Sequence, residues 1–98
     1  MSRQAYKGEK RYIGMTVNRR DTEAVVVASA TYEIRNAAGT VVQSGGASID
    51  GAEVFCLFDT TPEAIVADGN YYVWFEDIVI TGLPKVLKGR VLVEVLAG

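Results

Sequence analysis

The chain has 98 residues, of which 49% are hydrophobic, and a formal net charge of −2. This length fits one domain, and no apolar run approaches the roughly 18 residues that a membrane-spanning helix needs. The slight negative charge argues against nucleic acid as the main partner, because phosphate binding draws on an excess of basic side chains. We therefore expect one domain that contacts neither a membrane nor nucleic acid.

The residue types on which most catalytic and metal sites depend are absent or single. There is no histidine, and Cys56 is the only cysteine, which excludes an intrachain disulfide and a zinc site built from several thiolates. Cys56 stands in an apolar run and is expected to pack as a small hydrophobe. Glu76 and Asp77 are adjacent, but successive strand residues point to opposite faces, so they form no acid–base pair unless a bulge redirects one. We predict a non-enzymatic protein with no catalytic residue, no cofactor and no metal.

Basic residues are concentrated near the start of the chain. Residues 1–20 hold six basic side chains and one acid, whereas residues 21–98 hold four bases and eleven acids. Residues 1–11 show no periodicity, and we expect a basic N-terminal arm there, followed by a single β-sandwich domain over residues 12–98. The arm can lie on the acidic body of its own chain or of a neighbour. Its basic side chains are Arg3, Lys7, Lys10 and Arg11.

No apolar segment of the signal-peptide type follows Met1. We therefore expect synthesis in the cytosol without Sec export.

Alternating apolar residues predict strands through the first half of the chain. A first strand covers residues 11–18, and a polar turn follows at 19–22. The clearest alternation runs from 28 to 35, with Ala28, Ala30, Tyr32 and Ile34 expected to face the core. Residues 36–39 fit a type I turn with Gly39 in the left-handed region, from which the partner strand returns.

Four further elements are expected in the second half. The Asp50-Gly51 turn joins a short strand at 47–49 to a strand at 53–59. A helical turn is expected at 60–65, with Thr61 as its cap. A long strand follows the Asp68-Gly69 turn to about residue 80, bulged near Glu76 and Asp77. After a turn at 81–84 the last strand covers 86–96, with a bulge or kink at Gly89.

The strand that begins at Gly69 is the richest in aromatic residues. A period of two puts Tyr71, Val73 and Phe75 on the core face, and Tyr71 is expected to anchor the preceding turn through its hydroxyl. Tyr72 and Trp74 lie on the opposite face. They either pack under a loop or the N-terminal arm, or form an exposed platform for a subunit, a peptide or a sugar ring.

Seven or so short strands, turn signals about every ten residues and no full helix predict an all-β protein. The expected architecture is an immunoglobulin-like antiparallel β-sandwich. A partly open β-barrel is the alternative.

Three segments, residues 32–42, 69–75 and 87–95, resemble small immunoglobulin-like proteins of phages and prophages. They are similar to the N-terminal domain of phage baseplate upper proteins in a strand that ends in an Asn-x-x-Gly turn, a Gly-x-Tyr strand and a closing strand that contains Lys88-Gly89. The resemblance implies a structural protein of a virion, without catalytic residues.

The first hypothesis is therefore a non-enzymatic structural or interaction module, a virion component of tail or baseplate type that self-assembles or binds a neighbouring protein. The second is a carbohydrate-binding module that stacks sugar on Tyr72 and Trp74, and the third is an enzyme or its regulatory subunit. Because Val54–Phe58, Leu92 and Leu96 are expected to add apolar surface on the outer side, we predict a homo-oligomer, most simply a symmetric dimer, that buries Tyr72 and Trp74.

Overall fold

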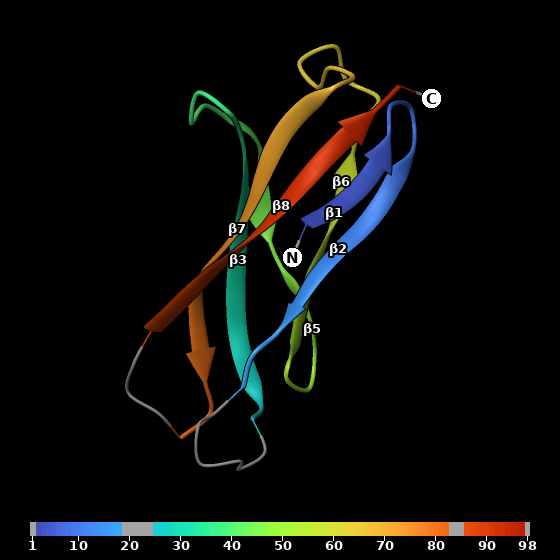
Figure 1. Cartoon of the computed structure of the whole chain (residues 1–98). Helices are drawn as coiled ribbons and strands as arrows, with labels where there is room; N and C mark the ends of the chain where they lie inside the picture. Colours follow the sequence, from blue (N-terminus) through green and yellow to red (C-terminus); the bar gives the residue numbers. More distant parts are fainter. Residues whose placement is uncertain (1, 19–24, 83–85, 98) are drawn as a thin grey trace.

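Two β-sheets pack face to face in the computed structural model, which describes residues 2–18, 25–82 and 86–97 and contains no helix in those ranges (Figure 1). The five-stranded sheet has the order β1 (Ser2–Tyr6), β8 (Val86–Leu96), β7 (Gly69–Ile80), β3 (Val27–Asn36) and β4 (Val41–Gly46). The three-stranded sheet has the order β2 (Lys10–Thr16), β6 (Glu53–Asp59) and β5 (Ser48–Asp50).

This partition of strands is that of an immunoglobulin-type sandwich, in which β7 lies between β8 and β3, opposite a sheet built from β2, β6 and β5. The all-β sandwich is confirmed, with eight strands in place of about seven. The sheets do not close on one another, so the alternative of a barrel is wrong. One strand pair, β1 with β8, is parallel, and the others are antiparallel.

The N-terminal segment belongs to the sandwich. Ser2–Tyr6 pairs along β8, from Ser2 opposite Leu92 to Tyr6 opposite Leu96, and Ala5 is fully buried. A tight turn then leads into β2 at Lys10. An edge strand, a turn and the first residues of β2 thus replace the basic arm expected over residues 1–11, and the sandwich begins at Ser2 instead of residue 12.

The core face of β7 is as predicted. Tyr71, Val73 and Phe75 are buried and share one cluster with Ile34 of β3. Cys56 packs in the same cluster, as expected, and burial raises the pKa of its thiol to about 12. The other buried apolar residues are Ala5, Ile13, Val17, Val25, Val27, Ala30, Val54, Phe58, Ile65, Ile78, Ile80, Val91, Val93 and Val95.

The first residues of β3 do not follow the predicted alternation. Ala30 and Ile34 are buried and Tyr32 is half-buried, but Ala28 is exposed and Val27 is buried in its place. The pairing of β3 with β7 shifts twice between Val27 and Thr31. Each such irregularity changes the phase of the inward-facing residues, which a strict period of two does not anticipate.

The predicted turns are confirmed where the structure describes them. Gly39 has φ 88°, and its N–H donates to the carbonyl of Asn36 at 2.9 Å. Asp50 and Gly51 connect β5 to β6. The turn expected at 19–22 lies outside the described residues, as do residues 83 and 84 of the turn expected at 81–84.

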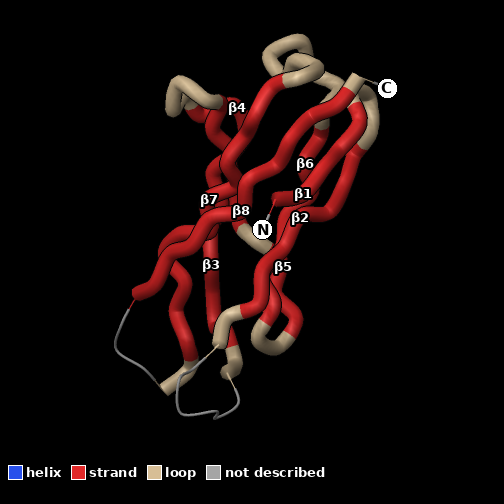
Figure 2. Tube along the Cα trace, viewed as in Figure 1, coloured by secondary structure: helices blue, strands red, loops and turns tan. Residues whose placement is uncertain are grey.

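The segment between β6 and β7 is a loop at the same end of the sandwich as the β1–β2 turn (Figure 2). The N–H of Ile65 donates to the carbonyl of Pro62 at 3.0 Å, which makes a single β-turn where a helical turn was expected. Thr61 caps no helix. Instead its own N–H and hydroxyl donate to the Asp59 carboxylate, at 3.0 and 2.7 Å.

The bulge predicted near Glu76 and Asp77 is present, and its extra residue lies in β7, so the shift does not place a bulge at Gly89 in β8. The pairing of β7 with β8 shifts between Phe75 and Ile78, and Asp77 has φ 50°. Gly89 lies opposite Phe75 beside this shift. A Cβ atom on Gly89 would lie 2.7 Å from the methyl carbon of Met15, so the glycine also makes room for a side chain of the other sheet.

Candidate functional site

Tyr72 and Trp74 project from the outer face of the five-stranded sheet, as predicted, and both are half-buried. Directly opposite residues on neighbouring strands share a face. Tyr72 lies between Leu92 of β8 and Arg35 of β3, and Trp74 lies between Arg90 and Glu33. The two aromatic side chains therefore stand among charged residues from the two neighbouring strands, β3 and β8.

Three cationic groups surround the Trp74 ring. The guanidinium carbon of Arg90 lies 5.4 Å from the ring centre, that of Arg35 5.5 Å, and the Lys88 ammonium 5.9 Å. Arg90 also lies 5.0 Å from the centre of the Tyr72 ring. Contacts of this kind are attractive because the ring face carries negative charge density. We call these five side chains the arginine–aromatic face.

Two carboxylates hold Arg35 in this position. Its Nη2 donates to Glu33 at 2.6 Å and to Glu76 at 3.2 Å. The hydrogen bond from Arg35 lowers the pKa of the Glu33 carboxyl below its ordinary value. Lys88 and Arg90 are exposed, so two of the three cations of the face are open to a partner.

The apolar surface expected around Tyr72 and Trp74 is divided between two faces. Leu92 does lie beside Tyr72. In Val54–Phe58, however, Val54, Cys56 and Phe58 point into the core, and Phe55 and Leu57 lie on the outer side of the other sheet. The sequence pattern did not distinguish the inward from the outward residues of Val54–Phe58, nor did it indicate which sheet each strand joins.

No family model, no curated protein and no solved structure matches this chain. What its surfaces can bind therefore has to be inferred from the residues that form them.

A second surface lies on the outer side of the three-stranded sheet. Tyr12 is 68% exposed and packs edge to face on Phe55, with ring centres 5.8 Å apart, while Leu57 lies opposite Tyr12. A groove of about 400 Å³ runs beside β2. It is lined by Arg3, Arg11, Tyr12, Ile13, Gly14, Met15, Thr16, Glu53 and Phe55. Sequence reasoning missed this surface, although the outward positions of residues 12, 55 and 57 carried the signal.

The four residues of the expected basic arm do not form one patch. Arg3 and Arg11 both line the groove, and Nη1 of Arg11 lies 3.8 Å from Oε1 of Glu9. Lys10 is opposite Asp59. The ammonium of Lys7 donates to the carbonyls of Thr60 at 2.6 Å and Pro62 at 2.8 Å, so it fastens the β6–β7 loop of its own chain.

Thr60 is a structural residue that the sequence did not single out. It is fully buried, its hydroxyl accepts the N–H of Gly8 at 2.8 Å, and it lies 2.7 Å from the carbonyl of Glu9. The β1–β2 turn is thereby fixed to the end of β6.

Among the residues that the structure describes, no three Cys, Asp or Glu side chains lie close enough together to hold a metal ion. Glu76 is bound to Arg35, and the bulge leaves Asp77 exposed. No helix capable of crossing a membrane occurs in the part of the chain that the structure describes.

Proposed function

We propose that the protein is a non-enzymatic interaction module that binds protein, a second copy or a neighbouring subunit, through the arginine–aromatic face. The observation that carries this proposal is the grouping of Trp74, Tyr72 and Arg90 on the central strands of the larger sheet. Tryptophan, tyrosine and arginine are the residue types that dominate the binding energy of protein interfaces.

A protein partner fits this face better than a sugar does. Carbohydrate stacking needs an open aromatic ring, whereas cations from two neighbouring strands lie over Trp74 at 5.4–5.9 Å. A sugar ring would have to displace them. Carboxylates and carbonyl groups of a protein surface, in contrast, can bind Lys88 and Arg90 where they are.

The likeness of residues 32–42, 69–75 and 87–95 to phage immunoglobulin-like proteins supports a narrower form of the proposal. In that form the partner is another subunit of a virion. The chain then acts as a structural component without a catalytic residue or a bound cofactor.

Trp74 is the only tryptophan, so its fluorescence reports on this face alone. We expect its emission to move to shorter wavelength, and quenching by acrylamide to fall, when the protein is concentrated to about 1 mM or mixed with candidate virion subunits, a range that detects even weak association. Arg90→Glu should abolish the change, while Glu63→Gln, in the exposed β6–β7 loop, should leave it intact.

Two results would contradict the proposal. One is a Trp74 emission that stays fully quenchable with every subunit tried and at every concentration. The other is specific binding on a glycan array that disappears in Trp74→Ser, which would identify the second hypothesis, a carbohydrate-binding module, as correct.

A further inference from the structure

The outer edge of β2 carries backbone groups without a partner strand in the described part of the chain. The N–H of Val17 donates to Ala52, and the N–H of Thr60 donates to Glu9, at the two ends of the β2–β6 ladder. The register between these ends has no shift. Because an antiparallel ladder alternates, the N–H and C=O groups of every second residue point away from β6. These residues are Lys10, Tyr12, Gly14 and Thr16.

Of the four edge strands, β2 is the most open to pairing. Soluble proteins protect sheet edges with short strands, bulges, prolines or charges. β5 has three residues and β1 has five, while the pairing of β4 is broken by a shift between Ile34 and Arg35. β2 has seven residues, no proline and no bulge, and its two charged residues, Lys10 and Arg11, both lie at the first end of the strand.

We infer that β2 pairs in antiparallel fashion with β2 of a second copy, about a two-fold axis through Ile13, to give one continuous six-stranded sheet. This register pairs the full length of both strands. It places Tyr12 opposite Gly14 of the second copy, and Lys10 opposite Thr16 of the second copy. The inference uses the opposite face of the sandwich from the arginine–aromatic face and does not depend on it.

The register produces an apolar row on the outer side of the joined sheet. Leu57 is the neighbour of Tyr12, and Phe55 is the neighbour of Gly14. Across the axis the row reads Leu57, Tyr12, then Gly14 and Phe55 of the second copy. A strand glycine without a side chain admits the close approach of a neighbour, here the Tyr12 ring that is 68% exposed in the single chain.

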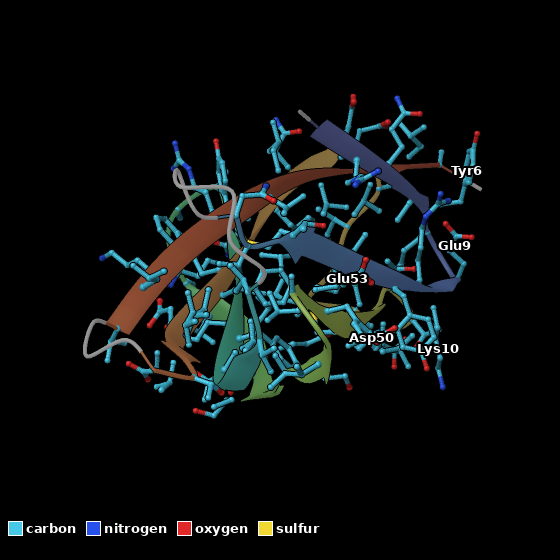
Figure 3. All side chains as sticks on the ribbon, turned by 90° about the horizontal axis from the view of Figure 1, so that it is seen from below. Tyr6, Glu9, Lys10, Asp50 and Glu53 are labelled. Atoms are coloured by element: carbon cyan, nitrogen blue, oxygen red, sulfur yellow. The ribbon has the colours of Figure 1, made fainter. Side chains whose placement is uncertain are left out.

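A row of complementary charge lies beside the apolar one. Lys10 is opposite Asp59, and Thr16 is opposite Glu53. In the dimer Lys10 therefore stands between Asp59 of its own chain and, beyond Thr16, Glu53 of the second copy. Figure 3 shows Lys10 and Glu53 together with β2, which diverges from β1 after the turn near Glu9. No like charges face one another across the axis.

The two nearest alternative registers fit less well. A shift of two residues in one direction places Tyr12 opposite its own copy and moves Lys10 beside Phe55. A shift in the other direction places Gly14 opposite Gly14 and leaves Lys10 without a partner. The length of the paired strands, the apolar contact and the charge complementarity thus select the same register.

The test is Thr16→Lys, measured by sedimentation velocity. The side chain is exposed and lies beside Glu53, so the variant should fold. It opposes Lys10 of the second copy and should abolish the dimer. Lys10→Glu combined with Thr16→Lys should restore the dimer. Ser48→Lys is the matched control, since Ser48 is exposed on β5, the opposite edge strand of the same sheet, and it should not affect assembly.

Amide hydrogen exchange provides the second readout. We expect the N–H groups of Tyr12 and Gly14 to become protected as the concentration of the wild type rises. A wild type that is monomeric at about 1 mM overturns the inference, since even a weak dimer forms at that concentration. So does a dimer that Thr16→Lys leaves unchanged. Because Trp74 lies on the other sheet, its emission is unaffected by β2 pairing, and the two proposals can fail independently.

Discussion

At the scale of single residues, Tyr71 ties the core to the loop before its strand. Its hydroxyl accepts the N–H of Val66 at 2.8 Å and donates to the carbonyl of Ala64 at 3.3 Å. Its ring packs edge to face on Phe58, with centres 5.7 Å apart. This corner was predictable because its signal is local, an aromatic residue two positions after an Asp-Gly turn.

We expect Tyr71→Phe to lower the free energy of unfolding by about 1–2 kcal/mol, because the N–H of Val66 and the carbonyl of Ala64 both lose their hydrogen-bond partner while the ring keeps its packing. Urea denaturation measures the change. Tyr6→Phe is the control, since Tyr6 is half exposed and should stay within about 0.5 kcal/mol of the wild type. Equal stability of the two variants would show that the hydroxyl bonds do not anchor the loop.

The surroundings of Trp74 were not predictable in the same way. Its cations come from β3 and β8, and no spacing within either segment indicates that Arg35 and Arg90 converge on one ring. A period of two shows that the tryptophan points outward. What it meets there depends on strand order and register, which are properties of the whole sheet.

At the scale of elements, the bulge in β7 places one residue in a conformation that favours glycine. Asp77 has φ 50° and is exposed, and Phe75 and Ile78 on either side remain buried. The bulge therefore moves the inward-facing positions of β7 from odd-numbered to even-numbered residues. Asp and Asn tolerate the left-handed region better than branched side chains do, which explains an acid at this position.

Substitution at Asp77 should separate backbone strain from side-chain chemistry. Asp77→Val should lower the free energy of unfolding by about 1–2 kcal/mol, because a branched residue is strained at positive φ. Asp77→Gly should match or slightly exceed the wild type. Thermal and urea unfolding of both variants check this, and a Val variant as stable as the Gly variant would mean that φ is not positive in solution.

One strand, β1, and one core position, Ala28, were predicted wrongly for physical reasons. β1 is short and polar, and it becomes a strand only by pairing with β8 at the other end of the sequence. Ala28 was placed in the core because the double shift near Val27 has no sequence marker such as glycine or proline. In both cases tertiary pairing overrides local pattern.

At the scale of the whole molecule, the pairing of the first and last strands can be tested with one matched pair of variants. Ala5 of β1 is fully buried in the core, while Gln4 on the same strand is exposed. Ala5→Asp should therefore cost about 3 kcal/mol or more, the penalty for burying a polar group without a partner. Gln4→Asp should cost less than about 1 kcal/mol, the repulsion from the exposed Glu94 opposite it.

Calorimetry of both variants distinguishes an edge strand from a loose arm. If residues 1–6 lay outside the sandwich, both substitutions would leave the melting temperature unchanged. A large fall for Ala5→Asp alone is the result that the parallel pairing requires.

The position of β8 also constrains the order in which the chain can fold. β8 is the last strand to be synthesised, yet it lies between β1 and β7 in the larger sheet. Until it leaves the ribosome, β1 has no strand to pair with, and one edge of β7 stays open. The hairpin of β3 and β4 and the three-stranded sheet can form earlier, but the sandwich closes only after β8 has been synthesised, so a nascent chain stalled before residue 86 should remain sensitive to protease.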